Sequence, residues 1–225
     1  MQSEWIKVMR ARIVGLSLAA LGGAVTVGTT ATRAWLINWG ATGDEIDATL
    51  SGDERISKVA TQGTMAITID APPEAVWPWL VQMGVDRGGL YSYLFVENTL
   101  LRLGVTNADR IVPEWQKREL GEIVWLGAPE HWSGNAKQIV AAIEPESHYI
   151  MTGEEDWKRL QAGGTANGTW GFILERLAEN RSRLIARSRY SAPPPGFELV
   201  HFIMERKMLL RLKELAEGQT GQHPS

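Results

Sequence analysis

The chain has 225 residues, a formal net charge of −3, ten tryptophans and no cysteine. The absence of cysteine excludes disulfide bonds, thiol catalysis and cysteine-ligated metals. A slightly acidic chain also has no overall attraction to nucleic acid, so we expect no nucleic-acid partner. The length suits one good-sized domain, or one domain with an appendage.

Residues 1–40 differ from the rest of the chain. Lys7, Arg10 and Arg12 precede Ile13–Thr32, a run of 20 residues without a charged side chain. About 20 such residues span a bilayer, and basic residues on the N-terminal side predict a main domain outside the cytoplasm. We expect a single-pass membrane anchor; a cleaved signal peptide and a helix packed on the protein itself are the alternatives. The tryptophans near the run are typical of interface anchors: Trp5, Trp35 and Trp39.

The rest of the chain is predicted to form one folded domain. Residues 41–63 are polar and rich in turn formers, which indicates a linker or an irregular wrap. The domain is expected over 64–217, followed by a disordered tail at 218–225. Its first strand begins at Thr64, where TMAITID alternates apolar and polar residues.

Two helices are predicted to follow this strand. Residues 71–84 read APPEAVWPWLVQMG, and early prolines, an early glutamate and a final glycine favour a helix there. The second helix is expected from about Ser92 to Leu103. The rest of the domain is predicted to contain strands at 121–127, 137–145, 147–153, 169–177 and 181–190, and a long helix at 197–217. This order indicates an α+β fold, an antiparallel sheet with its helices on one side.

Four stretches carry a resemblance to a known family. They read ITIDAPPEAVWPWLVQMG (67–84), DRGGLYSYLFVEN (86–98), ADRIVPEWQ (108–116) and HFIMERKMLL (201–210). The chain resembles the SRPBCC superfamily, which includes START domains, polyketide cyclases and birch-pollen-allergen-like proteins, and within it a bacterial membrane-associated subfamily of undefined activity. The resemblance implies a helix-grip fold: a curved antiparallel sheet wrapped on a long C-terminal helix, with two short helices after the first strand. It also implies an apolar ligand cavity and a place at the bacterial cell membrane.

The loop at 82–93 reads QMGVDRGGLYSY. Its glycines lack the spacing of a dinucleotide fingerprint, and Leu90 stands where a P-loop needs lysine. We interpret the loop as a structural lock between the two predicted helices. Tyr91 and Tyr93 are expected at the mouth of the pocket.

Glu97 is the residue that most suggests chemistry. On the predicted second helix it lies among apolar residues, where a carboxylate must be paired or become protonated. Arg87 and Arg110 are the expected partners. The three residues form either a structural ion pair or the catalytic candidates of a general acid/base site.

The strand predicted at 181–190 has two unlike faces. Leu184 and its alternate neighbours are expected to face the long helix, whereas Arg183, Arg187 and Arg189 are interpreted as a solvated or anion-facing outer surface. His201 is interpreted as a core histidine, and the acidic run at 154–156 as a solvated loop. The four histidines lack metal-ligand spacing, so we predict no metal site, and we expect no cofactor.

The favoured hypothesis is a membrane-tethered module that binds or carries a hydrophobic small molecule, such as a lipid or polyketide, between the sheet and the long helix. A cyclase/dehydratase-type enzyme that uses Glu97 with arginine or tyrosine partners is one alternative. A structural or interaction domain with a filled core is another. The candidate ligand-binding residues are Trp77, Trp79, Tyr91, Tyr93, Glu97, Trp170, Phe172, Tyr190, Phe202 and Met204.

Overall fold

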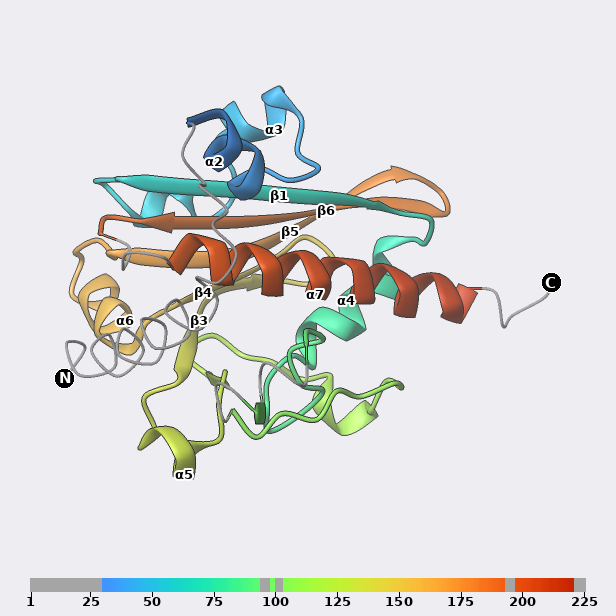
Figure 1. Cartoon of the computed structure of the whole chain (residues 1–225). Helices are drawn as coiled ribbons and strands as arrows, with labels where there is room; N and C mark the ends of the chain where they lie inside the picture. Colours follow the sequence, from blue (N-terminus) through green and yellow to red (C-terminus); the bar gives the residue numbers. More distant parts are fainter. Residues whose placement is uncertain (1–29, 94–97, 100–102, 193–196, 221–225) are drawn as a thin grey trace.

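The computed structural model describes residues 30–93, 98–99, 103–192 and 197–220. They form a curved antiparallel sheet with the order β1-β6-β5-β4-β3-β2, and a long C-terminal helix lies across one face (Figure 1). The strands are β1 (Thr61–Ile69), β2 (Ile123–Trp125), β3 (Lys137–Glu144), β4 (His148–Thr152), β5 (Gly168–Ala178) and β6 (Arg181–Tyr190). The helices are α2 (Thr30–Ile37), α3 (Gly43–Asp47), α4 (Pro73–Val81), α5 (Pro129–Trp132), α6 (Glu154–Gln161) and α7 (Phe197–Thr220), with short 3-10 turns at Asp53–Arg55 and Pro113–Trp115.

The predicted α+β class and antiparallel sheet are confirmed, and the arrangement is compatible with a helix-grip fold. Strand β1 begins at Thr61 rather than Thr64, and α7 continues to Thr220. Register shifts between Val140 and Ala142 in β3, and between Arg176 and Ala178 in β5, mark irregularities of the bulge type that bend a strand and increase its twist. Most of the helix predicted at 92–103 lies outside the described residues.

The main core lies between the inner face of the sheet and the helices α4 and α7. Trp79 and Leu80 from α4, Phe172 from β5, and Leu209 and Leu212 from α7 are buried there. Helix α4 forms because Pro73 occupies its first turn, where an amide hydrogen has no partner within the helix, and Glu74 follows near the positive end of the dipole. The apolar residues at alternate positions of the strands therefore pack against the apolar stripes of the helices, as the sequence pattern predicts.

The outer face of the sheet corrects one interpretation. Arg187 is 3% exposed and Asp53 is 7% exposed; their side chains pair at 3.3 Å, and Arg189 reaches the same carboxylate at 3.3 Å. Arg183 binds both carboxylate oxygens of Glu45, at 2.6 and 2.8 Å. The interpretation of these arginines as a solvated or anion-facing surface is therefore wrong. The segment 41–63 folds over them and supplies the carboxylates with which they pair.

The acidic run at 154–156 is also not a solvated loop. It forms the first turn of α6, where negative charge suits the helix dipole. Asp156 is buried, accepts a hydrogen bond from the Gly168 amide at 3.1 Å and pairs with Arg159. Three acidic residues in a row indicate the start of a helix, and the interpretation of the run as a loop is therefore wrong.

None of the helices in the described ranges is long and apolar enough to cross a bilayer. The predicted span Ile13–Thr32 lies almost entirely outside those ranges. Only its last residues are described, at the start of α2.

Replacing Asp53 by alanine tests the outer-face pairing. The variant leaves Arg187 buried without its carboxylate, so we expect the free energy of unfolding to fall by about 3 kcal/mol. Urea unfolding followed by circular dichroism measures the loss. Asp47→Ala, at an exposed site in α3, is the matched control and should change stability by less than about 0.5 kcal/mol. Equal, small effects of both variants would mean that the pairing does not hold the segment in place.

Candidate functional site

A cluster of polar side chains lies in the otherwise apolar layer between the sheet and α7. Strands β5 and β6 pair Trp170 directly opposite Ser188. His201 and Glu205 face them from α7, where a spacing of four residues places both on one side of a helix. Glu205 is 3% exposed, and a buried carboxylate requires partners. We call this set the inner polar cluster: Trp170, Ser188, Tyr190, His201 and Glu205.

Hydrogen bonds connect the cluster across the two layers. Trp170 donates from Nε1 to Glu205 Oε1 at 2.6 Å, and the other carboxylate oxygen lies 3.2 Å from His201 Nε2. Ser188 Oγ lies 2.9 Å from the same Nε2 atom. In a catalytic triad the carboxylate holds Nδ1 and leaves Nε2 for the serine. Here both groups contact one nitrogen, so the arrangement is not a serine-activating relay.

The cluster alters the acidity of its members. Burial lowers the pKa of His201, but the negative charge of Glu205 and its hydrogen bond outweigh this, and the pKa lies above the ordinary 6.5. Burial raises the pKa of Tyr190, and the charge of Glu205 raises it further. The cluster therefore favours the protonated form of the His201 imidazole and the neutral form of the Tyr190 phenol.

A small cavity of about 20 Å³ adjoins the cluster. About 10–15 Å³ is enough for one water molecule, whereas pockets for small molecules measure about 300–1,000 Å³. A larger molecule can enter only if part of the wall moves. The lining residues are Ile37, Thr61, Gly63, Met65, Ser188, Tyr190, His201 and Glu205.

One wall of the cavity comes from the N-terminal strap, which we define as residues 30–40. Asn38 and Trp39 accept hydrogen bonds from β1 amides, at Thr64 (3.1 Å) and Ala66 (3.0 Å). The strap ends at Gly40, whose φ of +73° and position against the Ala66 carbonyl leave no room for a Cβ. The strap thus caps the β1 edge and covers the cavity.

The loop at 82–93 is closed by its own backbone. Gly84 and Gly89 exchange two hydrogen bonds, at 2.9 and 2.7 Å, and the Gly88 amide donates to the Gln82 carbonyl at 2.7 Å. A Cβ at Gly88 would lie 2.5 Å from the Tyr91 hydroxyl, so a glycine is needed for this close approach. These contacts close the loop on itself next to the end of α4, whereas the second helix that it is predicted to join lies mostly outside the described residues.

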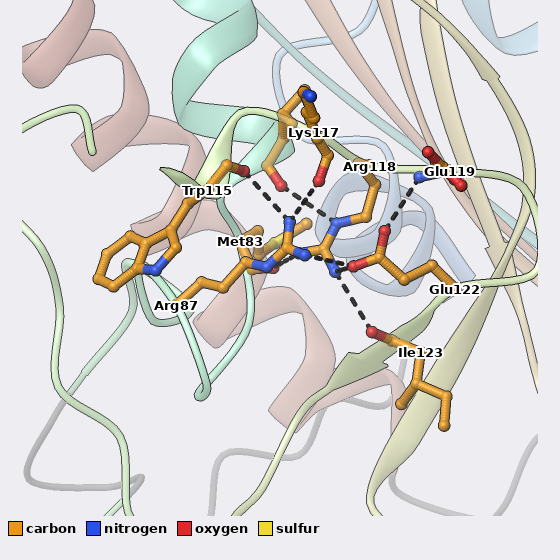
Figure 2. Close-up of polar contacts among 9 residues, drawn as sticks. Met83, Arg87, Trp115, Lys117, Arg118, Glu119, Glu122 and Ile123 are labelled. Atoms are coloured by element: carbon orange, nitrogen blue, oxygen red, sulfur yellow. Dashed lines mark hydrogen bonds and ion pairs between the residues drawn. The ribbon is translucent and has the colours of Figure 1, made fainter. Parts of the chain in front are cut away.

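Arg87 is held by structural partners. It donates to the carbonyls of Trp115 (3.1 Å) and Lys117 (2.9 Å) and pairs with Glu122 (Figure 2). The Arg110 side chain is exposed, and Glu97 lies outside the described residues. The expected pairing of Glu97 with Arg87 or Arg110 therefore stays a prediction.

Arg118 is the centre of this second network and was missed by sequence reasoning. Its side chain is fully buried; it donates to the carbonyls of Val81 (3.2 Å), Met83 (2.7 Å) and Ile123 (3.2 Å), and contacts Glu122 at 2.9 Å. The network thus ties the end of α4 to the start of β2 (Figure 2). We interpret this network as structural, because Arg118 donates hydrogen bonds mainly to main-chain carbonyls.

The predicted ligand-binding residues fall in three places. Trp170, Phe172 and Tyr190 lie together on the sheet, with the first two rings 5.0 Å apart, and Phe202 and Met204 belong to the facing helix. Trp79 and Tyr91 are buried near α4 with their rings 6.1 Å apart, and Trp77 is partly buried there. Burial raises the pKa of Tyr91 to about 12, although a hydrogen bond from Gln82 opposes this. Tyr93 lies on the surface.

Sequence reasoning missed Ser188 and Glu205 as members of a site. The signal available was the spacing of His201 and Glu205, which places a carboxylate on the same helical stripe as a histidine. The serine partner depends on the register of β6 against α7, which no local pattern contains.

No protein-family model and no curated protein matches the chain. Solved structures that are similar to it include a protein from Mesorhizobium loti, with 13% identity over 73% of this chain and 100% of that one (TM-score 0.40). The Aha1 dimer from Colwellia psychrerythraea shows 15% identity over 70% and 96% of the two chains (TM-score 0.42). A Bacillus cereus protein shows 12% identity over 72% and 99% (TM-score 0.42). Likeness at this level says nothing about chemistry, which must come from the residues themselves.

The raised pKa of His201 predicts a pH dependence of stability. The pairing with Glu205 stabilises the fold fully below the unfolded-state pKa, near 6.5, and this contribution is lost as pH rises through the folded-state pKa. Urea unfolding at pH values from below the unfolded-state pKa to above the folded-state pKa should show a free energy of unfolding that falls with rising pH. The variant His201→Gln should flatten this dependence on pH. His148→Gln, in β4, is the control and should keep the wild-type slope. An unchanged slope in His201→Gln would contradict the assignment.

Replacing Arg118 by methionine tests whether the second network is structural. The variant leaves several buried carbonyls and Glu122 without their donor, so the free energy of unfolding should fall by about 3 kcal/mol. The exposed Arg110→Met should change it by less than about 0.5 kcal/mol. Thermal and urea unfolding provide the measurement. A stable Arg118 variant would reopen a functional role for the network.

Proposed function

We propose that the chain is a helix-grip domain of the SRPBCC type that binds a hydrophobic small molecule between the sheet and α7. The inner polar cluster would hold the polar end of that molecule. The observation that carries the proposal is the position of this cluster: a buried, hydrogen-bonded group of ionisable side chains beside a cavity, within an apolar layer. Ligand pockets combine mostly apolar walls with a few placed polar groups.

The charges of the inner polar cluster restrict the kind of polar head group that a ligand can have. Glu205 and a protonated His201 compensate each other, so a charged head group would enter without a partner and at a large desolvation cost. A hydroxyl or carbonyl can instead exchange hydrogen bonds with Ser188 and Tyr190. The ligand class is therefore an apolar molecule with a neutral oxygen-containing head.

Entry of such a molecule requires a movement of the wall, because the cavity beside the cluster measures only about 20 Å³. The N-terminal strap contributes Ile37 to the wall, and the strap residues from Thr32 to Trp35 have exposed side chains. The strap also continues into the uncharged run Ile13–Thr32, which we propose to be a membrane anchor. Movement of the strap would open the cavity.

An acid–base enzyme is the second candidate, and the Glu205–His201 pair favours it. A buried histidine with a raised pKa beside a carboxylate can donate its proton to a substrate carbonyl and take a proton back from the product or from water, while the Glu205 carboxylate holds the imidazole in place. In this reading His201 replaces Glu97 as the proton donor.

Native mass spectrometry of the full chain, with organic extraction, tests the binding proposal. We expect a stoichiometric apolar molecule to accompany the wild-type protein. Glu205→Gln removes the charge with little change in shape, leaves His201 without its counter-ion, and should lower occupancy at least tenfold. Glu144→Gln, at an exposed site in β3, should retain the ligand.

The opposite result has a defined meaning. An empty wild-type protein that also fails to bind a fluorescent fatty alcohol would contradict the binding proposal. It would favour a domain whose core is filled by its own side chains. A bound molecule that leaves chemically altered would instead favour the enzyme.

A further inference from the structure

Three large apolar side chains are exposed around the first turns of α7. Trp35 on the strap is 61% exposed, Ile203 on α7 is 44% exposed, and Tyr93 is 41% exposed. Single exposed apolar residues are ordinary, but a contiguous group marks an interaction site. We call these three residues the α7 patch.

Contacts place the three side chains on one surface. The Trp35 ring lies 5.9 Å from that of Phe202, the neighbour of Ile203. This ring contact brings α2 of the strap against α7, while Figure 1 shows α2 next to β1. Next to Tyr93 in the chain, the Ser92 hydroxyl donates a hydrogen bond to the Met204 carbonyl of α7 at 3.1 Å. The patch therefore runs from the strap across α7 to Tyr93.

Cations accompany the exposed aromatic rings. The Arg206 guanidinium lies 4.8 Å from the centre of the Trp39 ring, and the Lys207 ammonium 5.9 Å from that of Tyr93. Arg33 on the strap is exposed. The carboxylate nearest in sequence to these α7 cations, Glu205, is turned inward to Trp170 and His201. The described part of the patch thus combines apolar rings with positive charge.

This combination fits the surface of a bilayer that contains anionic lipid. Tryptophan and tyrosine settle at the level of the head groups, where their apolar rings and polar tips are both satisfied. Lysine and arginine add attraction to anionic head groups. The uncharged run Ile13–Thr32 leads directly into α2, so any bilayer that it enters lies next to the patch.

We propose that the α7 patch docks on an anionic lipid bilayer, with Trp35, Ile203 and Tyr93 entering the head-group region and Arg206 and Lys207 facing the lipid charge. This goes beyond the proposed ligand binding and does not depend on it. Docking also places the cavity wall formed by the strap against the membrane.

The absence of cysteine allows a direct test in the full chain. Ile203→Cys, labelled with a polarity-sensitive fluorophore, reports on the patch. Leu177→Cys, at a 52% exposed site in β5, is the matched control. It lies beside the β5–β6 turn, where Arg181 pairs with Asp70, and the Asp70 amide donates to Glu217 near the C-terminal end of α7. The distance from Ile203 along the helix axis is about 20 Å. Both proteins are reconstituted into vesicles of phosphatidylcholine, with or without phosphatidylserine.

We expect the Ile203 label to shift to the blue and to become protected from iodide when phosphatidylserine is present, while the Leu177 label does neither. Neutralising the cations with Arg206→Gln and Lys207→Gln should remove most of this protection. Arg176→Gln, near the control label, should not. Circular dichroism shows whether each variant is folded.

Three results would overturn the proposal. Two labels that both stay aqueous would mean that the patch does not dock, whatever the N-terminal run does. Two labels that shift equally would mean unspecific insertion. A blue shift of the Ile203 label that grows with protein density in neutral vesicles would mean that a second copy covers the patch. The extraction experiment is independent, so the failure of either proposal can be recognised separately.

Discussion

The burial of α7 against the inner face of the sheet is the constraint on which the rest of the structure depends. Leu209, Leu212 and Ala216 become fully buried there, and this apolar contact sets the rotation of the helix about its axis. The same rotation turns His201 and Glu205 inward, four and eight residues after the helix begins at Phe197. Their polar groups must then find partners on the sheet, and Trp170 and Ser188 supply them. The chemistry of the interior is thus a consequence of packing at the other end of the helix.

On the outer face of the sheet, packing also decides which residues become partners, but the side chains there are charged rather than apolar. Arginines at alternate positions of β6 point away from α7, and they would remain in water if nothing covered them. The segment 41–63 covers them with Glu45 and Asp53 and turns a charged surface into a buried ion-pair layer. Such a layer stabilises little in net terms, because desolvation offsets attraction, but it is costly to break from one side. It therefore determines where the segment lies, and the start of that segment fixes the end of the strap.

The strap connects the interior of the protein to its surroundings. It closes the small cavity at the inner polar cluster with Ile37, and it presents Trp35 to the outside. Its two main hydrogen bonds go to the edge strand β1, whose amides would otherwise face solvent. Ligand entry and membrane docking would both act on this one element. On the two proposals, an equilibrium between a closed and a lifted strap would link them physically.

The sequence by itself determined the class of fold, because alternation in β5 and β6 and the helical stripe of 197–217 depend only on neighbours in the chain. It also indicated the tight turn at Gly88 and Gly89, since glycines in a loop are a local signal. Only the tertiary structure decided the partners. Arg187 meets Asp53 across 134 positions, Trp170 meets Glu205 across 35, and Arg87 meets Glu122 rather than a helix neighbour. These pairs follow from strand register and from the rotation of α7, which arise when separate elements bury their apolar faces together and which no local periodicity contains.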